Sequence, residues 1–186
     1  MNDTASDLAA TWAQAWDLMQ TGVRDARHAA RRVVLASVDA RGAPQQRMVA
    51  MRRADAPQAD IDIHTDLLST KIGEYQANPA ACVLVWDPET QVQLRLNGTI
   101  SIASGAQTAH QWPDMPQRVR ENYGHRPTPG QPIATSDGWE NVPHPDRFAV
   151  LTLHLDHMDH VCLDPNGHRR ARFERHTDWR GVWLSP

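Results

Sequence analysis

The chain has 186 residues, of which 40% are hydrophobic, and a formal net charge of −3. This length suits one domain, residues 1–186, and the hydrophobic content is sufficient for a core, which excludes global disorder. The small acidic charge gives no reason to expect a nucleic-acid or membrane partner.

The cysteine content and the N-terminal segment indicate a cellular compartment. The two cysteines, Cys82 and Cys162, lack metal-site spacing, so no disulfide framework is expected and a reducing cytoplasm fits. No basic residue precedes Arg24 and no long apolar run follows it. Neither a secretory signal nor a membrane span is therefore predicted.

The first predicted element is an amphipathic helix over residues 6–21, with Ser6 placed to cap its start and Gly22 its end. Its apolar residues recur at steps of three and four, the spacing of one helical face: Leu8, Trp12, Trp16 and Met19. Two tryptophans on one face bury a large area. We expect this helix to cover a barrel end or to form a subunit contact.

Strands dominate the rest of the chain. Apolar alternation and turn residues predict a hairpin of 31–38 and 44–53, then strands at 61–65, 81–86 and 92–102. A short helix that Ser69 caps and that runs to Gln76 follows the strand 61–65. Helical pieces at 105–123, an irregular loop at 124–147, a long strand at 148–163 and a C-terminal β-hairpin at about 169–184 follow. Many consecutive strands with few helices predict a closed or partly closed antiparallel barrel.

Cationic and hydroxyl side chains gather in the middle of the chain in a pattern that suits a phosphate. Strand alternation places Arg47 and Arg52 on opposite faces of one strand. His64 and Thr65 end the next strand, and Ser69-Thr70-Lys71 opens the helix that follows. Arginine forks, a lysine charge and the N–H groups of a helix start are the donors that phosphate needs.

These motifs, in this order, resemble the FMN-binding split barrel of the pyridoxamine 5′-phosphate oxidase family. The resemblance covers residues 31–102, with a weaker match at the C-terminus. It implies a mainly β (α+β) fold, an antiparallel split β-barrel of the FMN-binding type with flanking helices. It also implies FMN as the cofactor and a homodimer with FMN at the subunit interface.

The resemblance implies functional residues one by one. The implied cofactor-binding residues are Arg47, Met48, Val49, Met51, Arg52, His64, Thr65, Ser69, Thr70, Lys71, Gln93 and Arg172. The implied substrate-binding residues are Arg52, Arg169 and Arg170. No residue must act as an acid or base, so none is named as catalytic.

The chain also departs from the family pattern. His64 replaces an aromatic residue and Thr70 an arginine, and the run His168–Phe173 lacks the second, substrate-side histidine. The family's Tyr-x₃-Arg-x₃-Ser helix, which holds the substrate phosphate, has no match in 107–123. We therefore expect an FMN-binding oxidoreductase for a small molecule other than pyridoxine phosphate. A flavin-binding protein without turnover and a deazaflavin-dependent relative are the alternatives.

Histidines at every third position of the long C-terminal strand, His154, His157 and His160, raise the possibility of a metal site. On a strand, however, this spacing sends successive side chains to opposite faces. No metal is therefore expected. The sequence also lacks a Gly-x-Ser-x-Gly elbow, a Gly-rich dinucleotide fingerprint and a phosphate loop.

Overall fold

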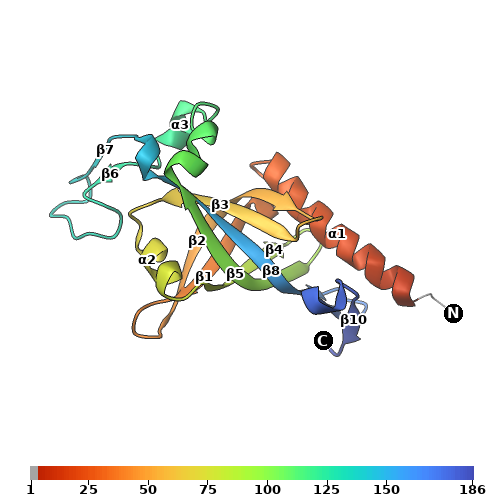
Figure 1. The fold of residues 1–186 in the computed structure, drawn as a ribbon. Coiled ribbons are helices and arrows are strands. Elements are labelled where there is room, and N and C mark those ends of the chain that lie inside the picture. The colour runs from red at the N-terminus through yellow and green to blue at the C-terminus, as the bar shows by residue number, and fades with distance from the viewer. Residues whose placement is uncertain (1–3) are drawn as a thin grey trace.

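Six antiparallel strands close into a barrel in the computed structural model, which describes residues 4–186 (Figure 1). Around the ring they are β1 (Arg32–Val38), β2 (Pro44–Asp55), β3 (Asp60–Asp66), β8 (Phe148–Cys162), β5 (Val92–Ser104) and β4 (Ala80–Asp87). Because β4 pairs again with β1, the ring closes. The predicted fold, an antiparallel split β-barrel with few helices, is confirmed.

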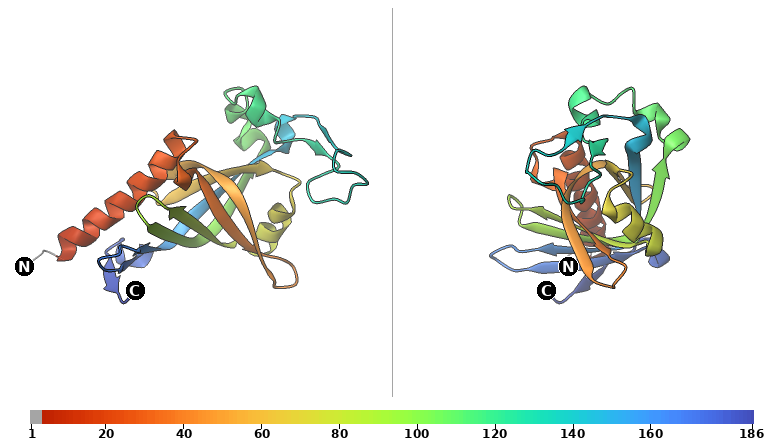
Figure 2. Two further views of the ribbon diagram at one scale, coloured as in Figure 1. Left: turned by 180° about the vertical axis from the view of Figure 1, so that it is seen from behind. Right: turned by 90° about the vertical axis from the view of Figure 1, so that its left-hand side faces the viewer.

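The longest strand, β8, holds the barrel together by pairing with three others. Its first half, 148–154, pairs with β3, and its second half, 157–162, pairs with β9 (Arg169–Glu174). Strand β5 pairs along both halves, and β10 (Val182–Leu184) extends the sheet beyond β9. The C-terminal strands therefore form a sheet extension at one end of the barrel (Figures 1 and 2).

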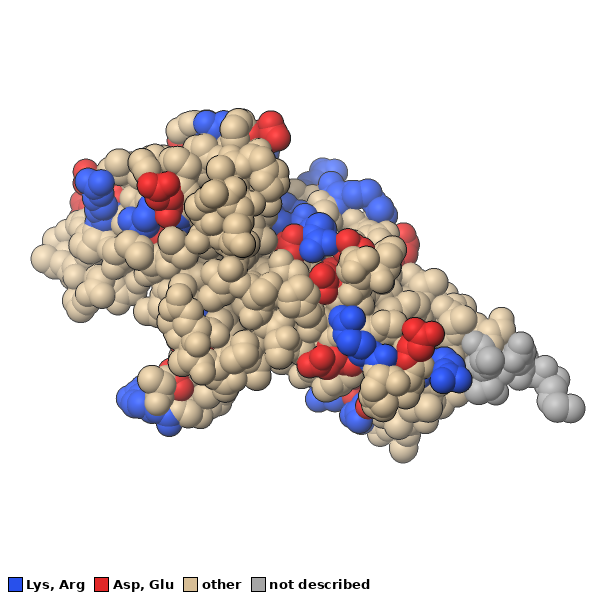
Figure 3. Space-filling view, viewed as in Figure 1, with Lys and Arg blue, Asp and Glu red and all other residues tan. Residues whose placement is uncertain are grey.

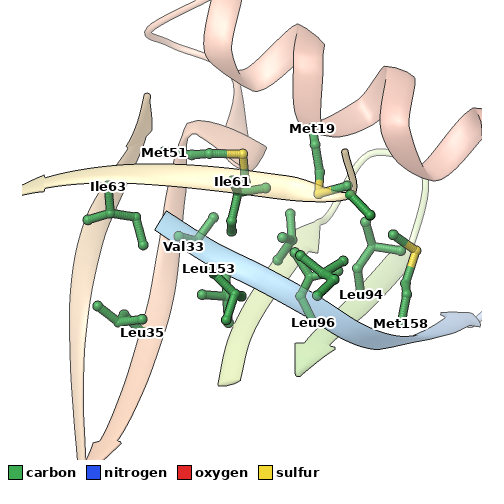
Figure 4. Packing of buried hydrophobic residues seen from close by; sticks show 14 of the residues in the cluster. Met19, Val33, Leu35, Met51, Ile61, Ile63, Leu94, Leu96, Leu153 and Met158 are labelled. Carbon is green, nitrogen blue, oxygen red and sulfur yellow. The ribbon is translucent and has the colours of Figure 1, made fainter. Parts of the chain in front are cut away.

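The barrel interior is filled by side chains from alternate strand positions, and Met19 points into it from the helix α1 (Figure 4). The largest completely buried residues include Leu35, Met51, Ile61, Ile63, Leu94, Leu96, Leu151, Leu153, Leu155 and Phe173. A six-stranded barrel this small has no space left for a large ligand. Any cofactor must therefore bind on the outside.

Helix α1 (Thr4–Arg24) packs along the barrel and is longer than the predicted 6–21. The predicted end at Gly22 is wrong, because the helix continues through this residue. A Cβ at Gly22 would lie 2.6 Å from the carbonyl carbon of Ala30. The glycine instead allows α1 to approach the 3₁₀ turn η1 (Ala29–Arg31).

The predicted helical region 105–123 is mostly short turns: η2 (Gly105–Gln107), η3 (Ala109–Gln111) and α3 (Gln117–Arg120). Gly105 has a left-handed backbone, and the two prolines in this region stop longer helices. The predicted loop 124–147 contains only β6 (His125–Arg126), β7 (Glu140–Asn141) and η4 (Pro145–Arg147). It projects from the barrel beside α2 (Thr70–Ala77), at the end opposite the termini (Figures 1 and 2).

The surface carries acidic and basic side chains close to one another on the face that Figure 3 shows. This mixing agrees with the small net charge of −3. No helix among residues 4–186 has the length and apolar character needed to cross a bilayer.

Replacing Gly98 should destabilise the barrel strongly. Gly98 lies at the bulge where β5 shifts register against β8, and an added Cβ would overlap the carbonyl oxygen of His154. We expect Gly98→Ala to lower the free energy of unfolding by at least about 2 kcal/mol in urea denaturation.

Gly73→Ala is the matched control. Gly73 lies on the exposed side of α2, where a Cβ would meet no atom, so this change should raise stability by about 0.5–1 kcal/mol. Equal effects of the two substitutions would contradict the proposed backbone contact at Gly98.

Candidate functional site

A cavity of about 590 Å³ lies between the outer faces of β2 and β3, the start of α2 and the segment 122–139. This volume is in the range of small-molecule sites. The structure brings seven of the implied binding residues to its wall: Met48, Val49, Arg52, His64, Thr65, Ser69 and Lys71.

Lys71 marks the end of the cavity where α2 begins. Its Nζ donates to the Oγ1 of Thr65 and to the Oγ of Ser69, both at 3.0 Å. Ser69 occupies the N-cap position of α2, but its hydroxyl accepts from Lys71 and makes no capping bond, contrary to the predicted cap. An ammonium has three donors, so one is left over after the two hydroxyls.

Lys71 makes no ion pair in the described part of the chain. Burial, assisted by Arg47 and only partly opposed by Glu74 and Asp66, lowers the pKa of Lys71 below its usual value. A half-buried cation without an ion pair is destabilised, and a bound anion would offset that cost. Lys71 is also the only lysine of the sequence.

Arg47 points away from the cavity. Its guanidinium forms an ion pair with Glu74 of α2 at 2.8 Å and donates to the Oγ of Ser37 at 2.5 Å. The structure thus places the first arginine of the motif behind the cavity wall. It ties β2 to α2 and orients the helix that carries Lys71.

Arg52 is the second cation of the cavity wall. Strand β2 pairs Met51 with Ile63 and Arg53 with Asp62, so Arg52 is the extra residue of a β-bulge. Bulges redirect side chains and are frequent beside active sites. Arg53 is held by Asp62 at 2.6 Å, whereas Arg52 makes no ion pair within residues 4–186. Arg52 is therefore available to an anionic ligand.

His64 stands beside Arg52 on the neighbouring strand and lines the cavity. Burial, assisted by Arg52, lowers the pKa of His64 to about 4, so the imidazole is neutral at pH 7. Its ring meets Phe148 edge-on at 4.9 Å, and its Nδ1 is buried without a partner. The histidine fills the aromatic position of the motif as an uncharged ring.

An ion pair holds the outer wall of the cavity against the barrel. Asp66, at the end of β3, accepts from the Nε and Nη2 of Arg147 at 3.0 and 2.9 Å; Asp66 is buried and Arg147 is partly buried. The same carboxylate accepts from the backbone N–H groups of Gly124 and Leu68. The start and the end of the segment 124–147 are thereby fixed to β3.

The segment 122–139 supplies aromatic and neutral side chains to the cavity. Tyr123 packs on Phe148 at 5.1 Å between ring centres, and His125 lies 5.0 Å from Trp139. Trp139 remains 49% exposed although it lines the cavity. An exposed tryptophan at a cavity mouth offers a flat surface to a ligand.

Five of the implied residues lie elsewhere. The Met51 side chain is fully buried inside the barrel, and Gln93, Arg169, Arg170 and Arg172 lie on β5 and β9, away from the cavity wall. Thr70 is exposed at the start of α2, next to the cavity residue Gly130.

Three arginines, one from β5 and two from β9, surround one buried carboxylate. Asp159, 1% exposed on β8, accepts two bonds from Arg170 at 3.0 and 2.8 Å and one from Arg95 at 2.8 Å. Arg172 lies 3.6 Å away, with its Nε buried and without a partner. Strand register places Gln93 beside this group. Arg172 also lies 3.9 Å from a carboxylate oxygen of Glu174, so the three arginines exceed the two carboxylates by one positive charge.

The histidines of β8 serve other contacts. His154 lies 2.9 Å from Asp60 through Nδ1 and 2.9 Å from the Ser101 hydroxyl through Nε2. His160 is buried and faces a different cavity, beside α1. Within the described residues, no three metal-binding side chains gather at one point.

Sequence reasoning missed the ion pair of Asp66 with Arg147 and the carboxylate at Asp159. These contacts join residues that are 81 and 64 positions apart in the sequence, so no local pattern predicts them. One feature of the sequence pointed to the cluster at Asp159: a carboxylate in a strand expected to be buried requires cationic or hydrogen-bonding partners.

Comparisons with known proteins give one family. The family model of the pyridoxamine 5′-phosphate oxidase FMN-binding domain matches residues 10–104. A pyridoxine/pyridoxamine 5′-phosphate oxidase 2 from Arabidopsis thaliana is 28% identical over 149 residues, 72% of this chain and 74% of that protein. The oxidase of Anaeromyxobacter dehalogenans is 32% identical over 93 residues, 50% of this chain and 46% of that protein.

Solved structures agree on the fold. A pyridoxamine 5′-phosphate oxidase-related, FMN-binding protein from Nostoc punctiforme has a TM-score of 0.75 at 24% identity, covering 94% of this chain and 97% of that one. PhzG from Burkholderia lata, in complex with tetrahydrophenazine-1-carboxylic acid, has a TM-score of 0.72 at 19% identity, covering 100% and 95%.

The low pKa of His64 predicts a loss of stability in acid. The folded-state pKa is about 4 and the ordinary value is 6.5, so below about pH 6.5 the unfolded chain binds a proton that the folded chain rejects. Stability should therefore fall as the pH drops from about 6.5 to 4. His64→Phe should gain about 2 kcal/mol more over wild type at about pH 5 than at about pH 8.

Urea denaturation at both pH values measures this difference. The exposed His110, changed to Phe, controls for the loss of an imidazole elsewhere. A stability gain for His64→Phe that does not change with pH would show that packing, and not protonation, causes it.

Proposed function

The chain belongs to the pyridoxamine 5′-phosphate oxidase family, in its FMN-binding domain, and on that premise we propose that it is an oxidoreductase that binds FMN beside Lys71. One observation carries the proposal. The half-buried ammonium of Lys71 lies at the end of a cavity of about 590 Å³, with two hydroxyls on it and no ion pair within the described residues. A phosphate monoester would supply the missing negative charge.

The residues of the cavity fit the flavin nucleotide in their chemistry. Thr65, Ser69 and Lys71 offer hydroxyl and ammonium groups to the phosphate. Met48 and Val49 offer an apolar surface to the flavin ring. When bound, FMN supplies the redox chemistry, and the protein supplies binding, orientation and electrostatics.

We propose that a second copy of the chain completes the site. Gln93 and Arg172, two residues that the family motif assigns to the flavin, lie on the outer face of β5 and β9. A twofold pairing presents the same surface of both subunits to each other, so one chain's extension would serve its partner's cavity. The neighbouring strands carry exposed apolar side chains, Trp86 on β4 and Val182 and Trp183 on β10.

The substrate is a small molecule, and we propose that it is not pyridoxine phosphate. The helix that would hold a substrate phosphate is not present in the region 107–123, where only short turns form. Of the arginines there, Arg120 donates to the backbone carbonyls of Pro113 and Met115 and is therefore not free to bind a substrate phosphate.

For the compartment, we propose the cytoplasm. The free thiols of Cys82 and Cys162 fit a reducing cytoplasm.

The cofactor and turnover are tested together by the visible spectrum of the purified protein and by mass analysis of any released ligand. FMN that NADH or NADPH reduces and an acceptor reoxidises supports an oxidoreductase. FMN that stays oxidised supports a flavin-binding protein without turnover. A released deazaflavin would overturn the assignment of FMN.

The role of Lys71 predicts a preference for FMN over riboflavin. Lys71→Met removes the charge and keeps the side-chain length, so FMN affinity should fall about 10- to 100-fold. Riboflavin affinity should not change, because riboflavin lacks the phosphate. Titrations that follow flavin fluorescence measure both constants, with the exposed Arg27→Met as the control for lost charge.

Because Lys71 is the only lysine, amine acylation followed by peptide mass analysis reports on this site alone. FMN should protect Lys71 from acylation and riboflavin should not. Equal affinity of wild type for the two flavins would refute the phosphate site.

A shared site predicts complementation between defective subunits. Lys71→Met and Arg172→Met proteins should each bind FMN weakly. Mixing them with subunit exchange should restore tight binding to about one quarter of the sites, because half of the dimers are hybrids with one intact site of two. Light scattering during dilution should show a dimer that loses flavin as it dissociates.

The control mixture combines Lys71→Met with Ser69→Ala, both on the same wall of the cavity and both proposed to contact the FMN phosphate. It should restore nothing, since every site keeps one defect. A monomer that retains FMN, or restoration in the control mixture, would rule out the shared site.

A further inference from the structure

We propose that the substrate is a flat aromatic molecule with one negative charge, an aromatic carboxylate, held between Trp139 and Arg52. This inference rests on the proposed function, since it names the substrate class of the same cavity. It follows from two properties of the cavity wall, its charge content and its aromatic rim.

The cavity contains two cations that form no ion pair within residues 4–186: Lys71 and Arg52. Lys71 is committed to the FMN phosphate in the proposed function. Asp66 also lines the cavity, but two guanidinium nitrogens of Arg147 donate to its carboxylate, so this ion pair adds no net charge. Of the groups that a partner chain would bring, Arg172 is assigned to the flavin in the proposed function, and the other arginines of its cluster are bonded to a carboxylate. One guanidinium, that of Arg52, therefore remains for a substrate.

The segment 122–139 adds no further charge for an anion. Its one arginine, Arg126, is exposed and does not line the cavity. The preceding Arg120 is held by two backbone carbonyls and lies over the ring of Trp112 at 5.8 Å. A phosphate ester, with up to two negative charges, would find one partner where it needs several.

The rim of the cavity selects an aromatic ring. Trp139 and Ile133 are 49% and 42% exposed, and both line the cavity. A flat apolar ligand that covers these side chains removes their surface from water, which favours its binding. His125 lies 5.0 Å from Trp139 and supports one face of the indole, which leaves the other available for stacking.

Arg52 lies on a β-bulge, and this backbone geometry directs its side chain to the cavity. The extra residue turns the guanidinium outward beside His64, while the next residue, Arg53, is bound to Asp62 and Asp55. A planar guanidinium donates two parallel hydrogen bonds to a carboxylate. A substrate carboxylate on Arg52 would fix the position of the aromatic ring against Trp139.

Three probes of one shape test the charge: 1-naphthoate, 1-naphthamide and 1-naphthyl phosphate. Each is titrated by calorimetry into FMN-loaded wild type, Arg52→Met, Trp139→Leu and Trp139→Phe. The control is Arg118→Met, an exposed arginine of α3 outside the cavity. FMN content is measured for every protein before titration.

We expect wild type to bind naphthoate about 10- to 100-fold more tightly than naphthamide, and no less tightly than naphthyl phosphate. Arg52→Met should abolish the difference between naphthoate and naphthamide. Trp139→Leu should weaken all three probes by about 3- to 10-fold, and Trp139→Phe should restore most of that loss. Arg118→Met should bind as wild type does.

Two results would overturn the inference and leave the proposed function intact. One is tighter binding of naphthyl phosphate than of naphthoate to the FMN-loaded protein. The other is equal binding of all three probes, or no binding of any, by a protein that is saturated with FMN. A protein that takes up no FMN refutes the proposed function, and the substrate assignment falls with it.

Discussion

The complete filling of the barrel by its own side chains is the constraint from which the remaining structure follows. Because strand residues alternate between the inside and the outside, each strand that packs Ile61 or Leu153 inward must present its neighbours outward. Residues that could hold a ligand are restricted to those outward positions, to bulges and to strand ends. The cavity uses all three: the outer face of β2, the bulge at Arg52 and the end of β3.

Ion pairs decide which cations of the outer surface remain available. Arg47, Arg53 and Arg147 are each held by a carboxylate, and their contribution is to position β2, β3 and the segment 124–147. Arg52 and Lys71 make no such pair in residues 4–186. Partly buried cations without carboxylates are costly to keep, which is why they mark binding sites better than clusters of paired charges do.

The sequence predicted what depends on neighbours along the chain. Strand alternation, the N-terminal apolar stripe and the short helix after Ser69 gave the order of the elements and brought Thr65, Ser69 and Lys71 to one place. Sequence alone could not show that Arg47 would form an ion pair with Glu74, because which carboxylate lies beside an arginine depends on the packed structure. It also could not place Trp139 at the cavity, since the segment that carries it has no periodicity.

Strand β8 has a consequence for how the chain must fold. Its 15 residues pair with both β3 and β5, which precede it by more than forty residues. Until residues 148–162 emerge from the ribosome, β3 and β5 are open sheet edges, and open edges pair readily with other chains. The nascent protein is therefore most prone to aggregate before β8 has emerged, and a truncation before Phe148 would make that exposure permanent.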